Sequence, residues 1–450
     1  MNLTVRRFIY LAFFAVFFIV AASLLLYLQG YRYNSVKHKL ERTGAIMVDS
    51  QPSGVNIFLN DVPERHKTPT TLGSLWPQNY TIRLEADGYQ VWHKQLTVKP
   101  SVVTFTGKVH LWPNPATGEV AATGKINRTQ LSPDRENLLY NINSGLNAGL
   151  WIINLVSGKS TLLDRSTINS FAYLEWSPSG RQFLAAGSGN GLTTWQIYNL
   201  ALQNWQKLNL PTGIKIKAVH WGQSDDEVYF STPDEVYLFD RNTNITKLIW
   251  RERLNDFRIH DGLIFALGGN QSSSVTIKLL DLSNLQIILL DQPAGLSNNL
   301  EFLPAGHDWL PLFDYDRHSL YLLHSPLSES KPIRRLPEVT TLDWSPDYDR
   351  VLLTNNIEIW DYQIKADKLN FIARLGSPFS RTRYYLKEPY LLIAIDKEIW
   401  ALELDNRDTQ QRWLLARYDK TIEDIFVDTD AKTLTAQTAD KLYRLNLMAP

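Results

Sequence analysis

One short phrase recurs along the chain, and its spacing limits the folds that the chain can adopt. The triplet Trp-Ser-Pro occurs at residues 176–178 and again at 344–346, each time before a polar turn and an apolar run. Related phrases begin at Leu131 and Trp221, 45 residues before and 45 residues after Trp176. Spacing of this kind predicts a repeat architecture. Weaker copies of the phrase lie near residues 257–267, 302–313, 385–395 and 426–436.

A second stretch follows each copy and reads as strand, polar turn, strand, for example at residues 150–163 and 357–372. One unit is therefore about four short strands, and units of ~40–45 residues with four strands indicate the blades of a β-propeller. The two Trp-Ser-Pro copies lie 168 residues apart, or four units of 42. We therefore predict about eight blades in residues 120–450, with six or seven as alternatives.

The last unit lacks a fourth strand, because the chain ends at "KLYRLNLMAP". A strand near residues 105–124 is expected to complete it, which would join the two ends of the ring and remove an exposed sheet edge. Tryptophan also recurs once per unit in equivalent strands, as packing between neighbouring units requires. An aromatic rim for stacking of carbohydrate is the alternative for these residues. They are Trp176, Trp221 and Trp344 in one strand, and Trp151, Trp195, Trp360 and Trp400 in the next.

The N-terminus carries an apolar stretch, residues 8–28, without any charge and directly after Arg6 and Arg7. A transmembrane helix needs about 20 such residues, whereas the apolar core of a cleaved signal peptide has ~7–15. We predict an uncleaved membrane anchor after a short tail, residues 1–7, and before a juxtamembrane linker, residues 29–42. Basic residues flank both ends. We place the large C-terminal part outside the cytoplasmic membrane, because export signals begin with basic residues before an apolar run.

Residues 43–112 alternate apolar and polar side chains in short runs, such as 46–50 and 55–59, separated by turns. This pattern predicts a small antiparallel β domain. Pro113, Pro115 and Gly118 then break the strand pattern. We predict a linker at residues 113–119 that is short enough to restrict the orientation of the two domains. A flexible hinge is the alternative.

This stretch resembles the PEGA domain, although its tetrad reads Pro-Ser-Gly-Val. The resemblance implies a non-catalytic sheet module of envelope proteins in a spacer or adhesion role, with no ligand. The positions that match in order are Gly44, Ile46, Val48, Ser50, Pro52, Gly54, Thr68, Pro69, Tyr80, Gly88 and Tyr89. The repeated phrase resembles Tol-Pal-type and WD-repeat-like bacterial propellers, through residues 132–134, 176–178 and 344–347. That resemblance implies a fold and leaves the function open.

Motifs for chemistry are absent from the sequence. Lys and Arg equal Asp and Glu at 46 each, so nothing in the charge favours nucleic acid. Without cysteine the chain forms neither disulfides nor thiolate metal sites. It also lacks the zinc-protease, serine-hydrolase and phosphate-loop motifs. "GSGNG" at residues 187–191 is predicted as a hairpin turn.

Two further groups of residues contain side chains of the kinds found in metal or catalytic sites. His307, His318 and His324 fit no metal spacing and are predicted as surface or loop histidines. Acids lie beside aromatic residues at 308–318, but a sugar-cleaving pair of carboxylates needs a separation that sequence does not give. We therefore assign no catalytic, metal or cofactor-binding residue and expect no cofactor.

These observations predict an all-β, membrane-anchored, non-enzymatic envelope protein. Its partners would be the lipid bilayer, through residues 8–28, and an envelope protein or glycan, with no nucleic acid. The ligand-binding residues and the oligomeric state stay open. An enzyme acting on polysaccharide or peptide and a structural spacer for a surface layer are the alternatives. An acidic or histidine cluster at the propeller axis would favour the enzyme, and a bare apolar or aromatic end face would favour the binder.

Overall fold

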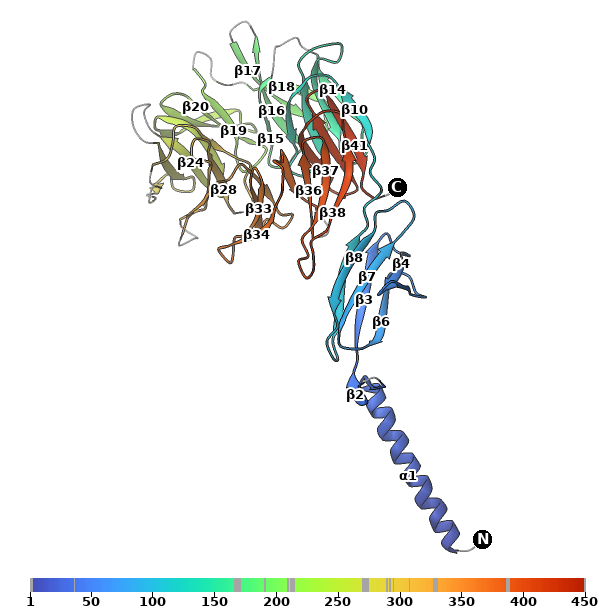
Figure 1. Ribbon diagram of the computed structural model, residues 1–450. Coiled ribbons are helices and arrows are strands. Elements are labelled where there is room, and N and C mark those ends of the chain that lie inside the picture. Colours follow the sequence, from blue (N-terminus) through green and yellow to red (C-terminus); the bar gives the residue numbers. More distant parts are fainter. Residues whose placement is uncertain are drawn as a thin grey trace.

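The chain forms a helix, a small β domain and a large ring of sheets, in that order (Figure 1). The computed structural model describes residues 3–448 except 36, 166–170, 190–191, 209, 211–214, 269–274, 289, 291–292, 294, 307, 327–330 and 386–388. Helix α1 (Leu3–Leu28) makes no burying contact with the rest of the chain. In the part of the chain that is described, it is the one helix long and apolar enough to cross a membrane. A membrane anchor and a signal sequence both fit that finding.

The segment predicted as a linker holds an antiparallel hairpin, β1 (Tyr31–Asn34) and β2 (Lys39–Arg42). The small domain follows as two sheets. Their strand orders are β6-β3-β9 and β5-β4-β7-β8. The strands are β3 (Gly44–Gln51), β4 (Asn56–Leu59), β5 (Val62–Pro63), β6 (Thr70–Leu75), β7 (Asn79–Glu85), β8 (Trp92–Thr97) and β9 (Val103–His110).

The predicted alternation in the small domain is confirmed, because Ile46 and Val48 of β3 are fully buried between exposed or half-buried neighbours. One pairing differs from the antiparallel prediction. Strand β9 runs parallel to β3, with Ala45 beside Val103 and Gln51 beside His110. The connection after β8 brings the chain back to the end of the domain where β3 starts, so β9 has to run in the same direction.

Eight four-stranded antiparallel sheets follow within the described residues from Glu119 to Asn446. Seven are built from consecutive strands. The first four are β11 (Ile126–Leu131), β12 (Asn137–Ile142), β13 (Gly149–Asn154), β14 (Ser160–Asp164); β15 (Phe171–Trp176), β16 (Gln182–Gly189), β17 (Leu192–Asn199), β18 (Asn204–Lys207); β19 (Ala218–Trp221), β20 (Glu227–Ser231), β21 (Glu235–Asp240), β22 (Ile245–Arg251); and β23 (Leu254–His260), β24 (Leu263–Gly268), β25 (Thr276–Asp281), β26 (Ile287–Ile288). The next three are β27 (Leu300–Phe302), β28 (Leu310–Asp314), β29 (Ser319–Leu323), β30 (Ile333–Pro337); β31 (Thr341–Trp344), β32 (Arg350–Asn355), β33 (Glu358–Gln363), β34 (Lys368–Arg374); and β35 (Arg381–Tyr384), β36 (Tyr390–Ile395), β37 (Glu398–Glu403), β38 (Arg412–Arg417).

The eighth sheet closes the ring. Its order is β10-β41-β40-β39, from β10 (Glu119–Thr123), β39 (Ile422–Val427), β40 (Thr433–Thr438) and β41 (Lys441–Asn446). Strand β10 comes from the N-terminal side and pairs antiparallel with β41. The prediction that an N-terminal strand completes the last unit is therefore confirmed. Closure of this kind leaves neither end of the ring as an open sheet edge.

Gly118→Ala is expected to destabilise this closure by about 1–3 kcal/mol. Gly118 precedes β10 with a φ of +70°, and an added Cβ would lie 2.6 Å from the carbonyl oxygen of Arg444 in β41. The matched control is Gly376→Ala, where an added Cβ meets no atom within 4 Å. Equilibrium denaturation of both variants measures the effect, and equal stability of the two would contradict it.

The recurring Trp and Ser explain why the chain repeats its phrase. The indole nitrogens of Trp176 and Trp221 donate to the backbone carbonyls of Gln130 and Glu175 in the preceding sheets, at 3.1 Å each. Ser345 closes the turn after Trp344, because its hydroxyl accepts the backbone N–H of Arg350 at 3.0 Å. Trp176, Trp221 and Trp344 are buried, which confirms the packing role. Each copy of the phrase that contains this Trp therefore joins its sheet to the preceding one.

Candidate binding surfaces of the propeller

A buried ion pair joins the small domain to the ring. Lys94 of β8 is fully buried, and its Nζ lies 2.8 Å from Oε2 of Glu403, at the end of β37. The same ammonium donates to the backbone carbonyl of Asp405 at 2.8 Å. The other carboxylate oxygen of Glu403 accepts the indole N–H of Trp92 at 3.1 Å. A charge buried this deeply holds its position only while its partner stays in place.

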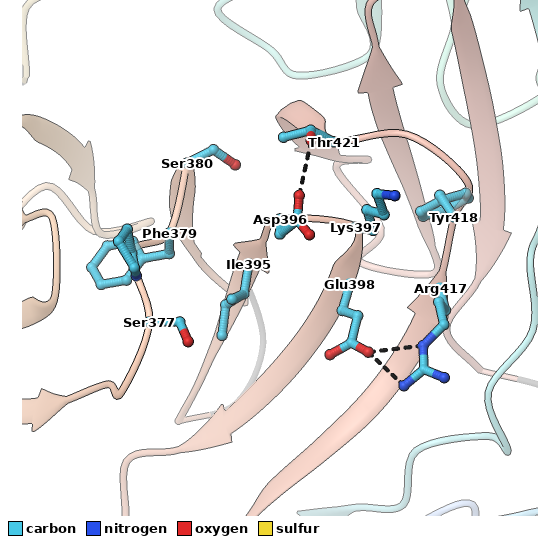
Figure 2. A pocket seen from close by; sticks show the side chains of 11 residues that line it. Ser377, Phe379, Ser380, Ile395, Asp396, Lys397, Glu398, Arg417, Tyr418 and Thr421 are labelled. Atoms are coloured by element: carbon cyan, nitrogen blue, oxygen red, sulfur yellow. Dashed lines mark hydrogen bonds and ion pairs between the residues drawn. The ribbon is translucent and has the colours of Figure 1, made fainter.

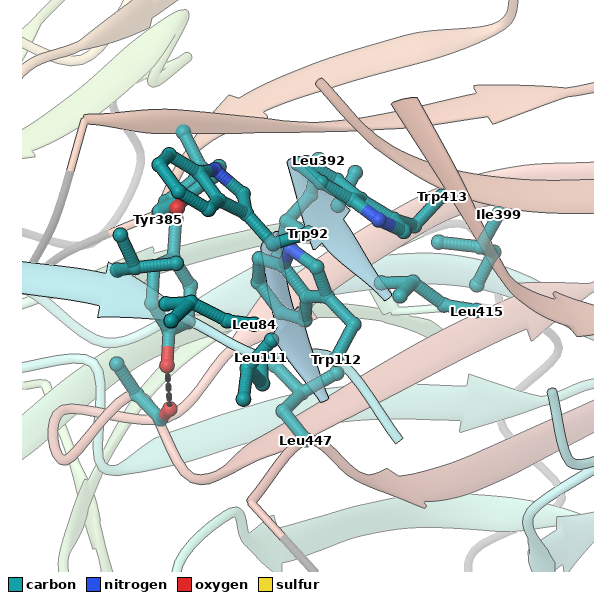
Figure 3. Close-up of a cluster of buried hydrophobic side chains, with 14 of the residues drawn as sticks. Leu84, Trp92, Leu111, Trp112, Tyr385, Leu392, Ile399, Trp413, Leu415 and Leu447 are labelled. Carbon is teal, nitrogen blue, oxygen red and sulfur yellow. Dashed lines mark hydrogen bonds between the residues drawn. The ribbon is translucent and has the colours of Figure 1, made fainter. Parts of the chain in front are cut away.

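Apolar side chains extend this contact into one shared core (Figure 3). Trp112, at the end of the small domain, is fully buried. Its ring centre lies 5.1 Å from that of Tyr385 and 5.5 Å from that of Tyr390, both edge-on. The core combines Leu84, Trp92 and Leu111 from the small domain with Leu392, Ile399, Trp413 and Leu415 from the seventh sheet and Leu447 from the chain end.

The loop between β37 and β38 also forms hydrogen bonds with exposed backbone groups of the small domain. Gln411 accepts the backbone N–H of His93 and donates to its carbonyl. Asp408 accepts the backbone N–H of Gln95 at 2.8 Å, and Arg407 donates to the carbonyl of Phe105 at 2.7 Å. We call this whole contact the joint. It supports the prediction of a restricted orientation and argues against the flexible hinge.

The joint fixes which end of the ring turns toward the helix. The turns that take part in the joint follow the first strands of the seventh and eighth sheets, at Tyr385 and Ala431, and the third strand of the seventh sheet, at residues 404–411. We call this end the proximal face. The opposite end, the distal face, is formed by the turns after each second strand and by the connections between sheets. In Figure 1 the small domain and α1 lie on one side of the ring.

A cavity of about 730 Å³ opens on the distal face, at the end of the seventh sheet and between the segments that connect this sheet to the sixth and the eighth (Figure 2). Phe379, Ile395 and Tyr418 provide aromatic and apolar walls. Glu398 and Arg417 form an ion pair at the rim, with 2.8 Å between Oε1 and Nε. A second distal cavity, of about 540 Å³, lies at the corresponding turn of the third sheet and carries mainly charged residues. Its lining is Thr232, Asp234, Glu235, Arg251, Glu252 and Arg253.

The inner strands carry a ring of mostly polar side chains around the axis. The first strands of neighbouring sheets contact one another, so these strands form the inner edge. The register of each first strand with the second strand of its sheet aligns one residue per sheet at the same height along the axis. This residue is the one before Trp where the repeated phrase contains Trp, and we call the set of eight the axial ring. These residues are Gln130, Glu175, His220, Arg258, Glu301, Asp343, Arg383 and Phe426.

His220 lies at the centre of one half of this ring. Its Nδ1 lies 2.7 Å from the hydroxyl of Tyr173 and 3.2 Å from Oε2 of Glu175, and its Nε2 lies 3.3 Å from Oδ1 of Asp256. The guanidinium of Arg258 lies against the imidazole. Burial alone would raise the pKa of Glu175, but His220 and Arg258 outweigh it, so the pKa is lowered. The pKa of Asp256 is lowered for the same reasons.

Arg383 connects the inner strands in the other half of the axial ring. Its guanidinium lies 3.1 Å from Oδ1 of Asp343 in β31 and 3.0 Å from Oδ1 of Asp424 in β39, and it donates to the carbonyl of Ile425 at 3.2 Å. Nearby, the Tyr315 hydroxyl donates to Glu301 at 2.5 Å. The axis thus holds an acidic and histidine cluster in which several carboxylates face cationic partners. Within the described residues, no three His, Asp or Glu side chains converge in a way that could hold a metal ion.

The scattered histidines, the glycine-rich hairpin and the acids near residue 314 do not form a site. His318 and His324 stand at opposite ends of β29, and His307 lies outside the described residues. Residues 187–189 of "GSGNG" are the end of β16, and they pair with the start of β17 as a hairpin requires, although residues 190–191 are not described. Asp314 is fully buried and accepts backbone N–H groups, while Asp316 accepts a hydrogen bond from Asn299. Sequence reasoning missed the joint and the axial ring.

Comparison with known proteins gives two domains. Residues 43–111 match the model of the PEGA domain. The C-terminal WD40 domain of Sif2 aligns with 74% of this chain and 99% of its own, at 15% identity and a TM-score of 0.50. The Dos1 propeller covers 74% and 95%, at 11% identity and 0.49. An oligogalacturonate lyase in complex with manganese covers 74% and 98%, at 12% identity and 0.39. No curated protein matches the sequence.

At this identity, the likeness to the Sif2 domain shows the fold alone. It agrees with the ring of four-stranded sheets seen here. Residues 43–111 are thus similar to the PEGA domain, and they lie between an apolar N-terminal helix and a C-terminal ring with the fold of a β-propeller.

Proposed function

We propose that the chain is a non-enzymatic protein of a bacterial envelope that binds a protein or glycan partner through the distal face of its propeller. Helix α1 serves as an uncleaved anchor in the cytoplasmic membrane, and the rest of the chain lies outside. The observation that carries this proposal is the joint. It locks the propeller to the small domain through a shared core and the pair Lys94–Glu403, and so holds the distal face away from the helix.

A propeller held at a fixed angle to the membrane and a fixed height above it is suited to docking to a partner that is itself fixed in the envelope. A loosely tethered domain would lose orientation entropy on docking, and a stiff joint reduces that loss. The cavity beside Phe379 and Tyr418 combines apolar walls with a charged rim, which is the usual composition of a binding site. The charged cavity at the third sheet extends the same face.

An enzyme acting on polysaccharide or peptide is the second candidate, and the His220 cluster favours it. A carboxylate and a histidine side by side are the groups that general acid–base catalysis uses. However, both ring nitrogens of His220 already contact Tyr173, Glu175 or Asp256. We therefore interpret the cluster mainly as a bridge between inner strands. Turnover of a polysaccharide or peptide that Glu175→Gln abolishes would favour the enzyme instead.

The chain has no cysteine, so a single introduced cysteine marks one position. Lys397→Cys lies on the distal face, beside the larger cavity, and Tyr348→Cys lies on the proximal face as the matched control. Whole cells are treated with a membrane-impermeant maleimide that carries a photoreactive group. We expect both positions to react, and only position 397 to form a crosslinked adduct with an envelope protein or glycan.

Other outcomes of this experiment would contradict the proposal. Reaction only after lysis would place the propeller in the cytoplasm. Adducts from both positions in equal yield would remove the preference for the distal face. Labelling without any adduct would favour the spacer, because the joint would serve a spacer equally well.

A further inference from the structure

The hairpin β1–β2 begins at the end of the apolar helix, and its second strand returns to the same place. Gly30, two residues after α1, accepts hydrogen bonds from the backbone N–H and the hydroxyl of Thr43, at 2.9 and 3.0 Å. Its own N–H donates to the carbonyl of Tyr27. Both ends of the hairpin are therefore held at the last turn of α1. If α1 spans a bilayer, β1 and β2 lie at the level of the headgroups.

The two faces of the hairpin differ in chemistry. Tyr33 pairs with Leu40 across the strands, so both side chains lie on one face, and they are 59% and 53% exposed. On the other face, the guanidinium of Arg32 stacks on the ring of Tyr27 at 3.6 Å. Exposure of an aromatic and an aliphatic side chain to water costs free energy, because it leaves apolar surface hydrated. Tyrosine, in contrast, is enriched where a membrane meets water.

The charge of the hairpin is positive. Residues 31–42 contain four Lys and Arg side chains and a single carboxylate, Glu41, for a net charge of +3. Glu41 lies 2.8 Å from Nζ of Lys39 and 3.3 Å from Nζ of Lys37. Hydrogen bonding to Lys39 lowers the pKa of Glu41 to about 2, so its charge, and the net +3, persist over the physiological range. The two lysine side chains are more than half exposed.

We propose that this hairpin seats in the headgroup layer of an anionic bilayer, with Tyr33 and Leu40 at the membrane–water boundary and its cations on lipid phosphates. The proposal rests on the anchoring role of α1 proposed above. A basic segment next to a membrane gains about 1 kcal/mol per Lys or Arg from anionic lipids. The apolar pair adds contacts that a purely electrostatic attachment would lack.

Such seating would also extend the joint's effect. Thr43 leads into β3 without an intervening linker, because β3 begins at Gly44. An added Cβ at Gly44 would lie 2.4 Å from the carbonyl oxygen of Lys99, so the chain passes tightly into the small domain at this point. A hairpin held on the bilayer surface would therefore restrict the tilt of the small domain, and with it the tilt of the propeller.

The test uses the full chain in nanodiscs of phosphatidylcholine, alone or mixed with phosphatidylglycerol. A nitroxide on Ser35→Cys, in the exposed hairpin turn, reports its depth through collisions with oxygen and with a water-soluble nickel complex. The control label is on Val62→Cys, 63% exposed in β5 of the small domain. We expect the oxygen-to-nickel ratio at position 35 to rise severalfold in the anionic discs and to stay unchanged at position 62.

Charge variants test whether the lysines are attracted to the anionic lipid or whether the hairpin responds to the changed lipid mixture for another reason. Lys37→Gln with Lys39→Gln should remove most of the rise, whereas Lys37→Arg with Lys39→Arg should keep it. A label at position 35 that stays as exposed to nickel as the label at position 62 would overturn the proposal. So would dipolar coupling between labels at position 35, because a second copy of the chain would then cover the hairpin.

A label on Phe17→Cys, within α1, distinguishes failure of the hairpin from failure of the anchor. Its oxygen-to-nickel ratio should be that of hydrocarbon in both lipids. If it is, a water-exposed position 35 overturns the hairpin proposal alone. If Phe17 also lies in water, the anchoring function itself is wrong.

Discussion

Lys94→Ala is expected to lower the free energy of unfolding by about 3–5 kcal/mol. The substitution leaves Glu403 buried at the joint without a cation, and only the Trp92 indole and more distant groups still face it. The matched control is Lys368→Ala, an exposed lysine of β34, which should change stability by less than about 0.5 kcal/mol. Denaturant unfolding of the detergent-solubilised chain measures both.

The same variant tests the stiffness of the joint. The wild-type chain should resist protease between Pro113 and Gly124, because β10 pairs with β41 and Pro113 contacts Tyr89. In Lys94→Ala this segment should be cut, releasing the small domain from the propeller. The double variant Lys94→Met with Glu403→Met should recover much of the lost stability, since it buries no charge. A double variant no more stable than Lys94→Ala would mean that packing alone sets the cost.

The architecture could be predicted from the sequence because packing between the sheets requires similar residues at regular intervals. Trp176, Trp221 and Trp344 each donate to the preceding sheet, so the same residue recurs at the same place in these three units. The closing strand was predictable for a related reason, since the last unit was short by one strand. The period-2 alternation of the small domain followed from its one-sided burial, as at Ile46 and Val48.

The joint was not predictable, because its partners lie far apart in the chain. Lys94 and Glu403 are separated by 309 residues, and each on its own looks like a charged residue in an ordinary strand. Periodicity describes which face of a strand is buried but does not say which surface covers it. The parallel pairing of β9 and the hairpin at residues 31–42 were missed because both depend on where the chain returns in space.

The axial ring was partly within reach. Where the repeated phrase contains Trp, the residue before it can be read directly, which gives Glu175, His220 and Asp343. In other sheets Ile259, Phe302 and Tyr384 occupy the position of the Trp, so the level of Arg258, Glu301 and Arg383 becomes clear only from strand register. A sequence search for catalytic motifs also looks for short spacings, whereas these residues lie about one unit apart.

Arg383→Met is the second change with a large expected effect, about 3–5 kcal/mol. Arg383 bridges three inner strands, because it sits in β35 and contacts Asp343 of β31 and Asp424 of β39. Methionine fills a similar volume but leaves both carboxylates without that cation. Arg381 still lies 3.0 Å from Asp424, so the loss should concern Asp343 most. The exposed Arg181→Met is the matched control.

Arg383→Lys separates charge from geometry. Lysine keeps the positive charge, but a single ammonium cannot reproduce a planar fork that meets two carboxylates and the carbonyl of Ile425. Its stability should therefore fall between those of the wild type and Arg383→Met. Hydrogen exchange should locate the loss in β31, β35 and β39, since these strands share the guanidinium. If β31, β35 and β39 instead stay protected while exchange increases in the other sheets, Arg383 does not bridge the inner strands. The axial cluster would then need another role, of which catalysis is the first to examine.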